Sequence, residues 1–205
     1  MSNKISSPYI FTKGEKKIIK DKFTCHNDWD TNGVFDPIKT NIKEDLRPKQ
    51  TNKCCYCKKE LGYDIKEVEI EHIVPKSKYE AFTFEPLNLA LSCPACNTKK
   101  SHTDTLVRSF TRYTKTSKNY LIVHAHLDNY DEHIVIHNDC LFEGISKKGC
   151  RTIEICELFR LKTVEKKAKK KLSTRTKQSE LISLAIKATP AELAELMTEI
   201  SKRIK

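Results

Sequence analysis

The chain has 205 residues, of which 38% are hydrophobic and 32% are charged, and its formal net charge is +11. This composition predicts a folded protein with one sizeable core and argues against an intrinsically disordered one. The excess of positive charge favours a polyanion as partner, either nucleic acid or an anionic membrane surface.

Two further features of the sequence bear on the cellular compartment of the protein. No stretch approaches the roughly 18 uncharged residues of a membrane span, and the segment 1–17 lacks the apolar centre of a signal peptide. We therefore expect a cytoplasmic protein, and a reducing compartment argues against a disulfide framework for its nine cysteines. Cysteines in paired spacing then indicate a metal site.

The first part of the chain is polar with scattered aromatic residues. Asn32-Gly33 and Asp36-Pro37 predict turns, and the segment 38–46 predicts a short helix. Apolar and polar residues alternate over 68–74, which is typical of a strand, and Pro75 should end it.

The second half of the chain predicts two more strands and a helical end. The segments 119–126 and 134–136 carry short apolar runs typical of strands. From Thr152 onward apolar residues recur at helical spacing. Thr189 before Pro190, with Glu192 three residues after the threonine, predicts the start of a last helix.

Four cysteines have the spacing of a structural zinc site. Cys54 and Cys57 form one C-x2-C pair, and Cys93 and Cys96 form a second. Four thiolates complete a tetrahedron around Zn²⁺ and leave no open position for chemistry, so this zinc should hold the fold together. Cys55 is an alternative ligand to Cys54, although its spacing to the next cysteine is less suitable.

Three blocks in this region agree in order and spacing with a known motif. Residues 68–75 read VEIEHIVP, Asn88 follows, and residues 93–101 read CPACNTKKS. The pattern resembles the HNH endonuclease family, over about 50 residues. The resemblance implies an α+β protein with a ββα-metal core, in which a hairpin and a helix clasp one divalent ion and cut nucleic acid.

The resemblance also implies roles for individual residues. His72 would be the general base that deprotonates a water molecule, since imidazole titrates near neutral pH. Glu71 and Asn97 would offer oxygen ligands to a catalytic Mg²⁺ or Mn²⁺. Asn88 would orient His72 through its amide. Lys99 and Lys100 are candidates for contacts with backbone phosphate groups.

Two positions depart from the usual motif, and one geometric problem remains. The acid is often Asp, and the third motif residue is often His, whereas this chain has Glu71 and Asn97. Strict strand alternation would place Glu71 and His72 on opposite faces. Both can serve one site only if the strand bends or ends there, as Pro75 suggests.

The flanking segments resemble a narrower group within this family. Residues 47–50, 128–134 and 149–155 are similar to segments of the PtuB proteins of Septu anti-phage defence systems and their retron-linked versions. That resemblance implies a PtuA-like partner, an ATPase of the ABC/SMC-like kind, and further partners in a retron reverse transcriptase and its RNA–DNA hybrid.

On this basis we expect four regions. They are an N-terminal extension (1–50), a zinc-clamped nuclease core (51–115), short strands and loops packed on the core (116–150), and a helical C-terminal region (151–205). The segment 124–134 concentrates histidines and acids, which predicts a polar loop or, alternatively, a second metal site. The role of His124, His126 and His133 is left open.

Two hypotheses compete with a nuclease. A zinc-knuckle protein can bind nucleic acid without cutting it, and a zinc-stabilised adaptor can present the helical end to a partner. The cysteines and the positive charge fit all three. Only Glu71, His72, Asn88 and Asn97 distinguish the nuclease, because a binding protein does not need this set.

Overall fold

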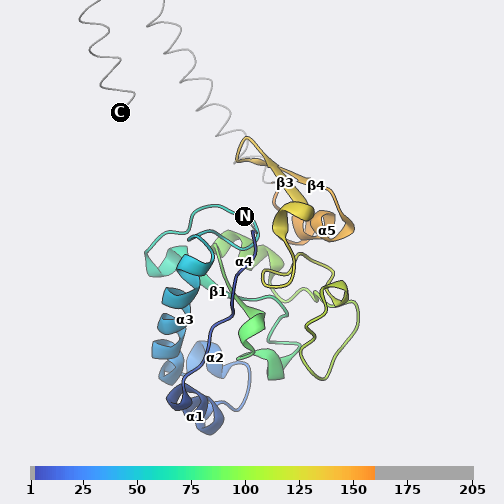
Figure 1. Cartoon of the computed structure of the whole chain (residues 1–205). Helices are drawn as coiled ribbons and strands as arrows, with labels where there is room; N and C mark the ends of the chain where they lie inside the picture. The colour runs from blue at the N-terminus through green and yellow to red at the C-terminus, as the bar shows by residue number, and fades with distance from the viewer. Residues whose placement is uncertain (1–2, 160–205) are drawn as a thin grey trace, which may run out of the picture. The chain divides into compact units, whose positions relative to one another are not determined.

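The computed structural model describes residues 3–159. In Figure 1 the helices α1 to α3 lie together at one end of this part, and β3, β4 and α5 lie at the other end. None of the described helices is long and apolar enough to cross a membrane.

Three helices precede the central motif. They are α1 (Lys13–Lys22), α2 (Asp28–Thr31) and α3 (Asp36–Lys49). A capping box between Thr12 and Glu15 starts α1, an element that the sequence analysis did not predict. The helix predicted over 38–46 is confirmed, but Asp36-Pro37 does not form a turn. It starts α3, because proline fits the first helical turn, where no N–H partner is needed.

The central motif folds as a hairpin followed by a helix. Strand β1 (Glu69–His72) pairs antiparallel with β2 (Leu89–Ser92), and His72 lies opposite Leu89. Helix α4 (Pro94–Lys100) follows directly and contacts β1. The predicted α+β fold with a ββα core is therefore confirmed, and β1 ends at His72, before Pro75.

The strand predicted over 119–126 is wrong. The chain there forms no strand and pairs with a neighbouring segment only in one isolated antiparallel bridge, between Tyr120 and Leu106. The Leu121 backbone N–H donates to the Thr105 carbonyl at 2.7 Å, and the Val123 N–H donates to Thr152 Oγ1 at 2.8 Å. Apolar residues buried for packing alone can thus imitate a strand pattern.

The remaining described elements follow this segment. Strand β3 (Ile134–His137) confirms the strand predicted over 134–136, and its partner is β4 (Leu141–Gly144). Helix α5 (Lys147–Ile155) starts earlier than predicted, capped by Ser146. The helix predicted from Thr189 lies outside the described residues. Short 3-10 turns complete the inventory: η1 (Gly33–Phe35), η2 (Ile65–Glu67), η3 (Glu80–Phe82), η4 (Pro86–Asn88), η5 (Ser117–Asn119) and η6 (Tyr130–Glu132).

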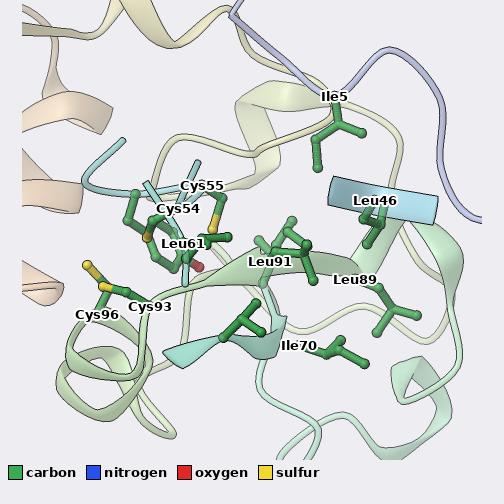
Figure 2. Packing of buried hydrophobic residues seen from close by; sticks show 14 of the residues in the cluster. Ile5, Leu46, Cys54, Cys55, Leu61, Ile70, Leu89, Leu91, Cys93 and Cys96 are labelled. Atoms are coloured by element: carbon green, nitrogen blue, oxygen red, sulfur yellow. The ribbon is translucent and has the colours of Figure 1, made fainter. Parts of the chain in front are cut away.

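The main hydrophobic core joins the N-terminal helices to the hairpin. Leu89 and Leu91 of β2 and Leu46 of α3 are fully buried in one cluster (Figure 2). The cluster also contains Ile70 of β1 and the cysteines Cys54, Cys93 and Cys96. Each such side chain contributes about 1.5–3 kcal/mol by leaving water. The hairpin is therefore fixed from both sides, by α3 and by the cysteine cluster.

Candidate active site

The four predicted cysteines come together at the end of the hairpin. Their sulfur atoms all lie within 4.8 Å of one another. The Cys57 and Cys93 sulfurs are 3.7 Å apart, close to the ~3.8 Å that a tetrahedron with Zn–S bonds of about 2.3 Å requires. Among the described residues no other group of three or more cysteine, histidine and acidic side chains is placed to share an ion.

Cys55 does not replace Cys54 in this group. Its backbone N–H donates to the Leu91 carbonyl at 2.9 Å. Burial raises the pKa of the Cys55 thiol well above its ordinary value, which keeps it protonated. The choice of Cys54 with Cys57 thus fits the structure, and Cys55 belongs to the core.

A cleft of about 380 Å³ opens beside the end of β1, between α2 and α4. Four of the predicted site residues line it, namely Glu71, His72, Asn97 and Lys100. Other residues in its lining are Trp29, Asp30, Lys76 and His102. Glu71 and His72 share this cleft because the strand ends at His72. The alternation of side chains along a strand therefore does not place these two residues in different sites.

His72 is fixed at the cleft wall by a backbone contact and an aromatic contact. Its Nε2 lies 3.0 Å from the Thr83 carbonyl oxygen, an acceptor only, so Nε2 carries the proton and Nδ1 keeps its lone pair. The Trp29 ring packs edge-on against the imidazole, with ring centroids 4.6 Å apart. Burial lowers the pKa of His72 to about 3, so the ring is neutral at physiological pH.

Asn88 fixes the loop that follows His72. Its Oδ1 accepts from the Val74 backbone N–H at 2.7 Å, and its Nδ2 donates to the carbonyls of Val74 and Phe82 at 3.0 Å each. The side chain is fully buried and does not line the cleft. This geometry suits the positioning role that the resemblance implies for Asn88.

Glu71 is fully buried, and its two carboxylate oxygens differ in their surroundings. Oε1 accepts from the Tyr56 hydroxyl at 3.0 Å and pairs with Lys100 Nζ at 2.6 Å, while Oε2 has no hydrogen-bond partner. Burial raises the pKa of the Glu71 carboxyl, and Lys100 and Tyr56 oppose that effect. A buried carboxylate oxygen without a partner is costly, so Oε2 fits a cation ligand.

Asn97 is oriented by Glu69, the first residue of β1. Its Nδ2 donates to Glu69 Oε2 at 2.6 Å. This bond commits the amide nitrogen and leaves the amide oxygen as the end that can serve a cation. Glu69 and Glu71 are two apart on β1, and that spacing is the signal that places both on the side of α4.

The two lysines of α4 differ from the expectation that both contact phosphate. Lys100 is 1% exposed, and its ammonium group donates to the His72 carbonyl at 2.9 Å besides pairing with Glu71. It lies four residues after buried Cys96 and therefore on the same face of the helix. Lys100 is thus the buried counter-ion of the Glu71 carboxylate. Lys99 remains half-exposed and pairs with Glu157 at 2.7 Å.

The histidines of the segment 124–134 form no metal site. His124 Nε2 lies 2.9 Å from the Tyr113 hydroxyl, and His124 Nδ1 accepts from the His126 N–H at 3.2 Å. His126 Nε2 lies 2.8 Å from the Leu89 carbonyl, and His133 Nδ1 lies 2.7 Å from Ser146 Oγ. With these partners the segment is a hydrogen-bonded polar loop. It reaches the site through Tyr113, whose hydroxyl lies 3.3 Å from Asn88 Oδ1.

Comparison with known proteins singles out the same segment. Residues 54–103 match the model of the HNH endonuclease family. This range holds the four cysteines and also Glu71, His72, Asn88 and Asn97. Trp29 and Asp30 lie outside it, although they line the cleft.

Two relatives are similar over longer stretches. The Septu protein PtuB of Bacillus thuringiensis is 31% identical over 145 residues, which cover 71% of this chain and 51% of that protein. The retron Vc95 putative HNH endonuclease of Vibrio cholerae serotype O1 biovar El Tor is 33% identical over 96 residues, which cover 44% of this chain and 41% of the relative. The chain thus spans about half the length of these relatives. No solved structure matches.

Proposed function

Since the chain carries a domain of the HNH endonuclease family, we propose that it is a metal-dependent endonuclease that hydrolyses phosphodiester bonds in nucleic acid. One observation carries this proposal: Glu71, His72 and Asn97 line one cleft, and the buried Glu71 Oε2 has no hydrogen-bond partner. We propose DNA over RNA as the substrate and Zn²⁺ as the ion of the four-cysteine group.

His72 and the residues that hold it have separate roles in the proposed reaction. His72 Nδ1 accepts the proton of the attacking water, and the Thr83 carbonyl holds the ring in the required tautomer. Because burial keeps the ring neutral, the Nδ1 lone pair is free to accept that proton. Asn88 keeps the loop in place.

Glu71 and Asn97 are the residues that would hold Mg²⁺ or Mn²⁺. Their oxygens are the hard ligands such ions prefer, and Asn97 is pre-oriented by Glu69. When bound, the ion neutralises charge on the phosphate and on the leaving oxygen. Because Asn97 offers an amide oxygen and not an imidazole nitrogen, the site should discriminate against softer ions more strongly than one with histidine in its place.

We further propose that the protein works in bacterial anti-phage defence. The support is similarity to proteins named for the Septu and retron systems. The partner proposed from the sequence is a PtuA-like ATPase of the ABC/SMC kind, and a retron reverse transcriptase with its RNA–DNA hybrid is the second candidate. A dependence on a partner would protect the host from an unregulated nuclease.

A cleavage assay tests the proposed activity. Zinc-loaded full-length protein is incubated with Mg²⁺ and supercoiled plasmid DNA, and in parallel with RNA. His72→Ala should lower the cleavage rate about 10²–10⁴-fold and retain the zinc and the fold. His137→Ala is the matched control, because His137 is half-exposed on β3 and does not line the cleft.

Equal cleavage by the wild type and His72→Ala would favour a non-catalytic zinc-knuckle binding protein or adaptor. If neither protein cleaves alone, the assay is repeated with the co-expressed ATPase. A complex that still does not cut either nucleic acid would contradict the nuclease assignment.

A further inference from the structure

Among the described residues that line the cleft, no lysine is free of an acidic partner, although the chain as a whole has a net charge of +11. Two lysines line it, and each is paired with an acid that also lines it. Lys100 Nζ lies 2.6 Å from Glu71 Oε1, and Lys76 Nζ lies 2.7 Å from Asp30 Oδ2. A phosphate group entering the cleft therefore finds a free ammonium group only if one of these pairs opens.

The two pairs differ in how readily they open. Lys100 and Glu71 are 1% and 0% exposed, so separating them would leave an unpaired charge in the interior. Lys76 and Asp30 are 20% and 61% exposed. An ion pair that water reaches contributes little, because water solvates both partners after separation. Lys76 is thus the lysine of the cleft that an incoming anion can recruit.

Both partners are held at fixed places beside His72. Lys76 stands two residues after Val74, whose backbone N–H and carbonyl are both bound by Asn88. Asp30 follows Trp29, whose ring packs against the imidazole of His72. The pair therefore lies in the lining of the cleft, beside the candidate general base.

We propose that Lys76 binds a backbone phosphate of the nucleic acid and that Asp30 is a built-in competitor that occupies Lys76 until the phosphate arrives. This rests on the proposed function, because it concerns how the same cleft takes its substrate. The phosphate replaces the Asp30 carboxylate at the ammonium group, and the carboxylate turns to solvent, where 61% of its side chain is already exposed. Asp30 thereby weakens non-specific binding.

Binding measured without cleavage tests this proposal. The parent is the full-length zinc-loaded protein with His72→Ala, and the probe is a fluorescein-labelled DNA duplex without added Mg²⁺, titrated at several salt concentrations. Lys76→Gln, Asp30→Asn and the double variant are compared with the parent. Arg151→Gln and Glu154→Gln are matched controls, because this pair is also exposed, at 43% and 66%, and does not line the cleft.

The proposal predicts a distinct result for each variant. Lys76→Gln should weaken binding about three- to tenfold and reduce the salt slope by about one, as expected for one lost phosphate contact. Asp30→Asn should tighten binding about two- to fivefold. A change in affinity of this size corresponds to the free energy of one exposed ion pair. The double variant should bind like Lys76→Gln, and each control should stay within about 1.5-fold of the parent.

Three outcomes would overturn the proposal. They are an unchanged salt slope in Lys76→Gln, no tightening in Asp30→Asn, and tightening that persists in the double variant, which would make Asp30 a general repulsive charge. A parent that does not bind the duplex overturns it as well. Loss of cleavage in the separate nuclease assay, with these binding differences intact, would count only against the proposed activity.

Discussion

At the scale of single residues, Asn88 concentrates three hydrogen bonds on the loop beside His72. The Asn88→Ala variant removes all three bonds and leaves the Val74 N–H and the Val74 carbonyl without a side-chain partner, while the Phe82 carbonyl keeps its bond from the Glu85 N–H. We expect the free energy of unfolding to fall by about 2–4 kcal/mol, measured by urea denaturation of the zinc-loaded protein. Asn41→Ala is the control: Asn41 is exposed and donates one bond to Glu15, so its loss should cost about 1 kcal/mol or less.

His124 gives a second prediction, this time for pH dependence. Burial lowers the pKa of His124 to about 3, whereas an unfolded histidine titrates near 6.5. Between these values the unfolded chain binds one more proton, so the stability that the neutral ring contributes is complete above about pH 6.5 and is lost as the pH falls toward 3.

The variant His124→Gln should therefore lose stability less steeply than wild type below pH 6.5, by up to about 1.4 kcal/mol per pH unit. Urea midpoints at several values from pH 7.5 to 5.5 measure this difference. Parallel pH profiles for wild type and His124→Gln would contradict the burial of a neutral ring.

The sequence predicted which motif residues lie together, but it did not predict the ion pairs around them. Spacing was sufficient to bring Glu71, His72 and Asn97 to one cleft, because a hairpin and a following helix leave little freedom. It did not pair Lys100 with Glu71 or Lys76 with Asp30, since these contacts join separate elements. The burial of Lys100 had a signal, namely its position four residues after Cys96.

At the scale of elements, α2 supplies part of the site from outside the matched domain. Trp29 is 5% exposed and contacts the rings of His72 and Phe84, at centroid distances of 4.6 and 5.2 Å. We expect Trp29→Ala to lower the free energy of unfolding by about 3–5 kcal/mol, because it empties a packed site. Trp29→Phe keeps a ring there and should cost clearly less.

Denaturation followed by circular dichroism measures both variants, since Trp29 is the only tryptophan and its fluorescence is lost. If Trp29→Ala were as stable as wild type, α2 would not be part of the core. In that case the N-terminal segment would not hold His72 in place.

The elements that sequence reasoning missed have physical explanations. Helix α1 is short and strongly polar, yet Thr12 and Glu15 carried the capping signal that marks its start. For the segment 119–126 the error was the opposite one, because a strand was predicted there and none forms. Its apolar residues are buried by contacts with distant parts of the chain, and a local pattern cannot distinguish such burial from pairing in a sheet.

At the scale of the whole described unit, the cysteine group should control folding. Its sulfurs join the loop at Cys54 to the start of α4 at Cys96, and a structural zinc of this kind contributes on the order of 10 kcal/mol to folding. We expect Cys57→Ser to lose zinc and cooperative thermal unfolding. Cys140→Ser should keep both, since Cys140 lies outside the group. Full zinc content in Cys57→Ser would contradict the assignment.

The central claim is that Glu71 and Asn97 bring oxygen ligands to one hard cation beside His72. The most direct measurement is a titration of the zinc-loaded protein with Mn²⁺, followed by electron paramagnetic resonance. Wild type and His72→Ala should bind one Mn²⁺, Asn97→Ala should bind it more weakly, and Glu71→Gln should lose most of the affinity while keeping its zinc. Unchanged Mn²⁺ binding in Glu71→Gln would contradict the account.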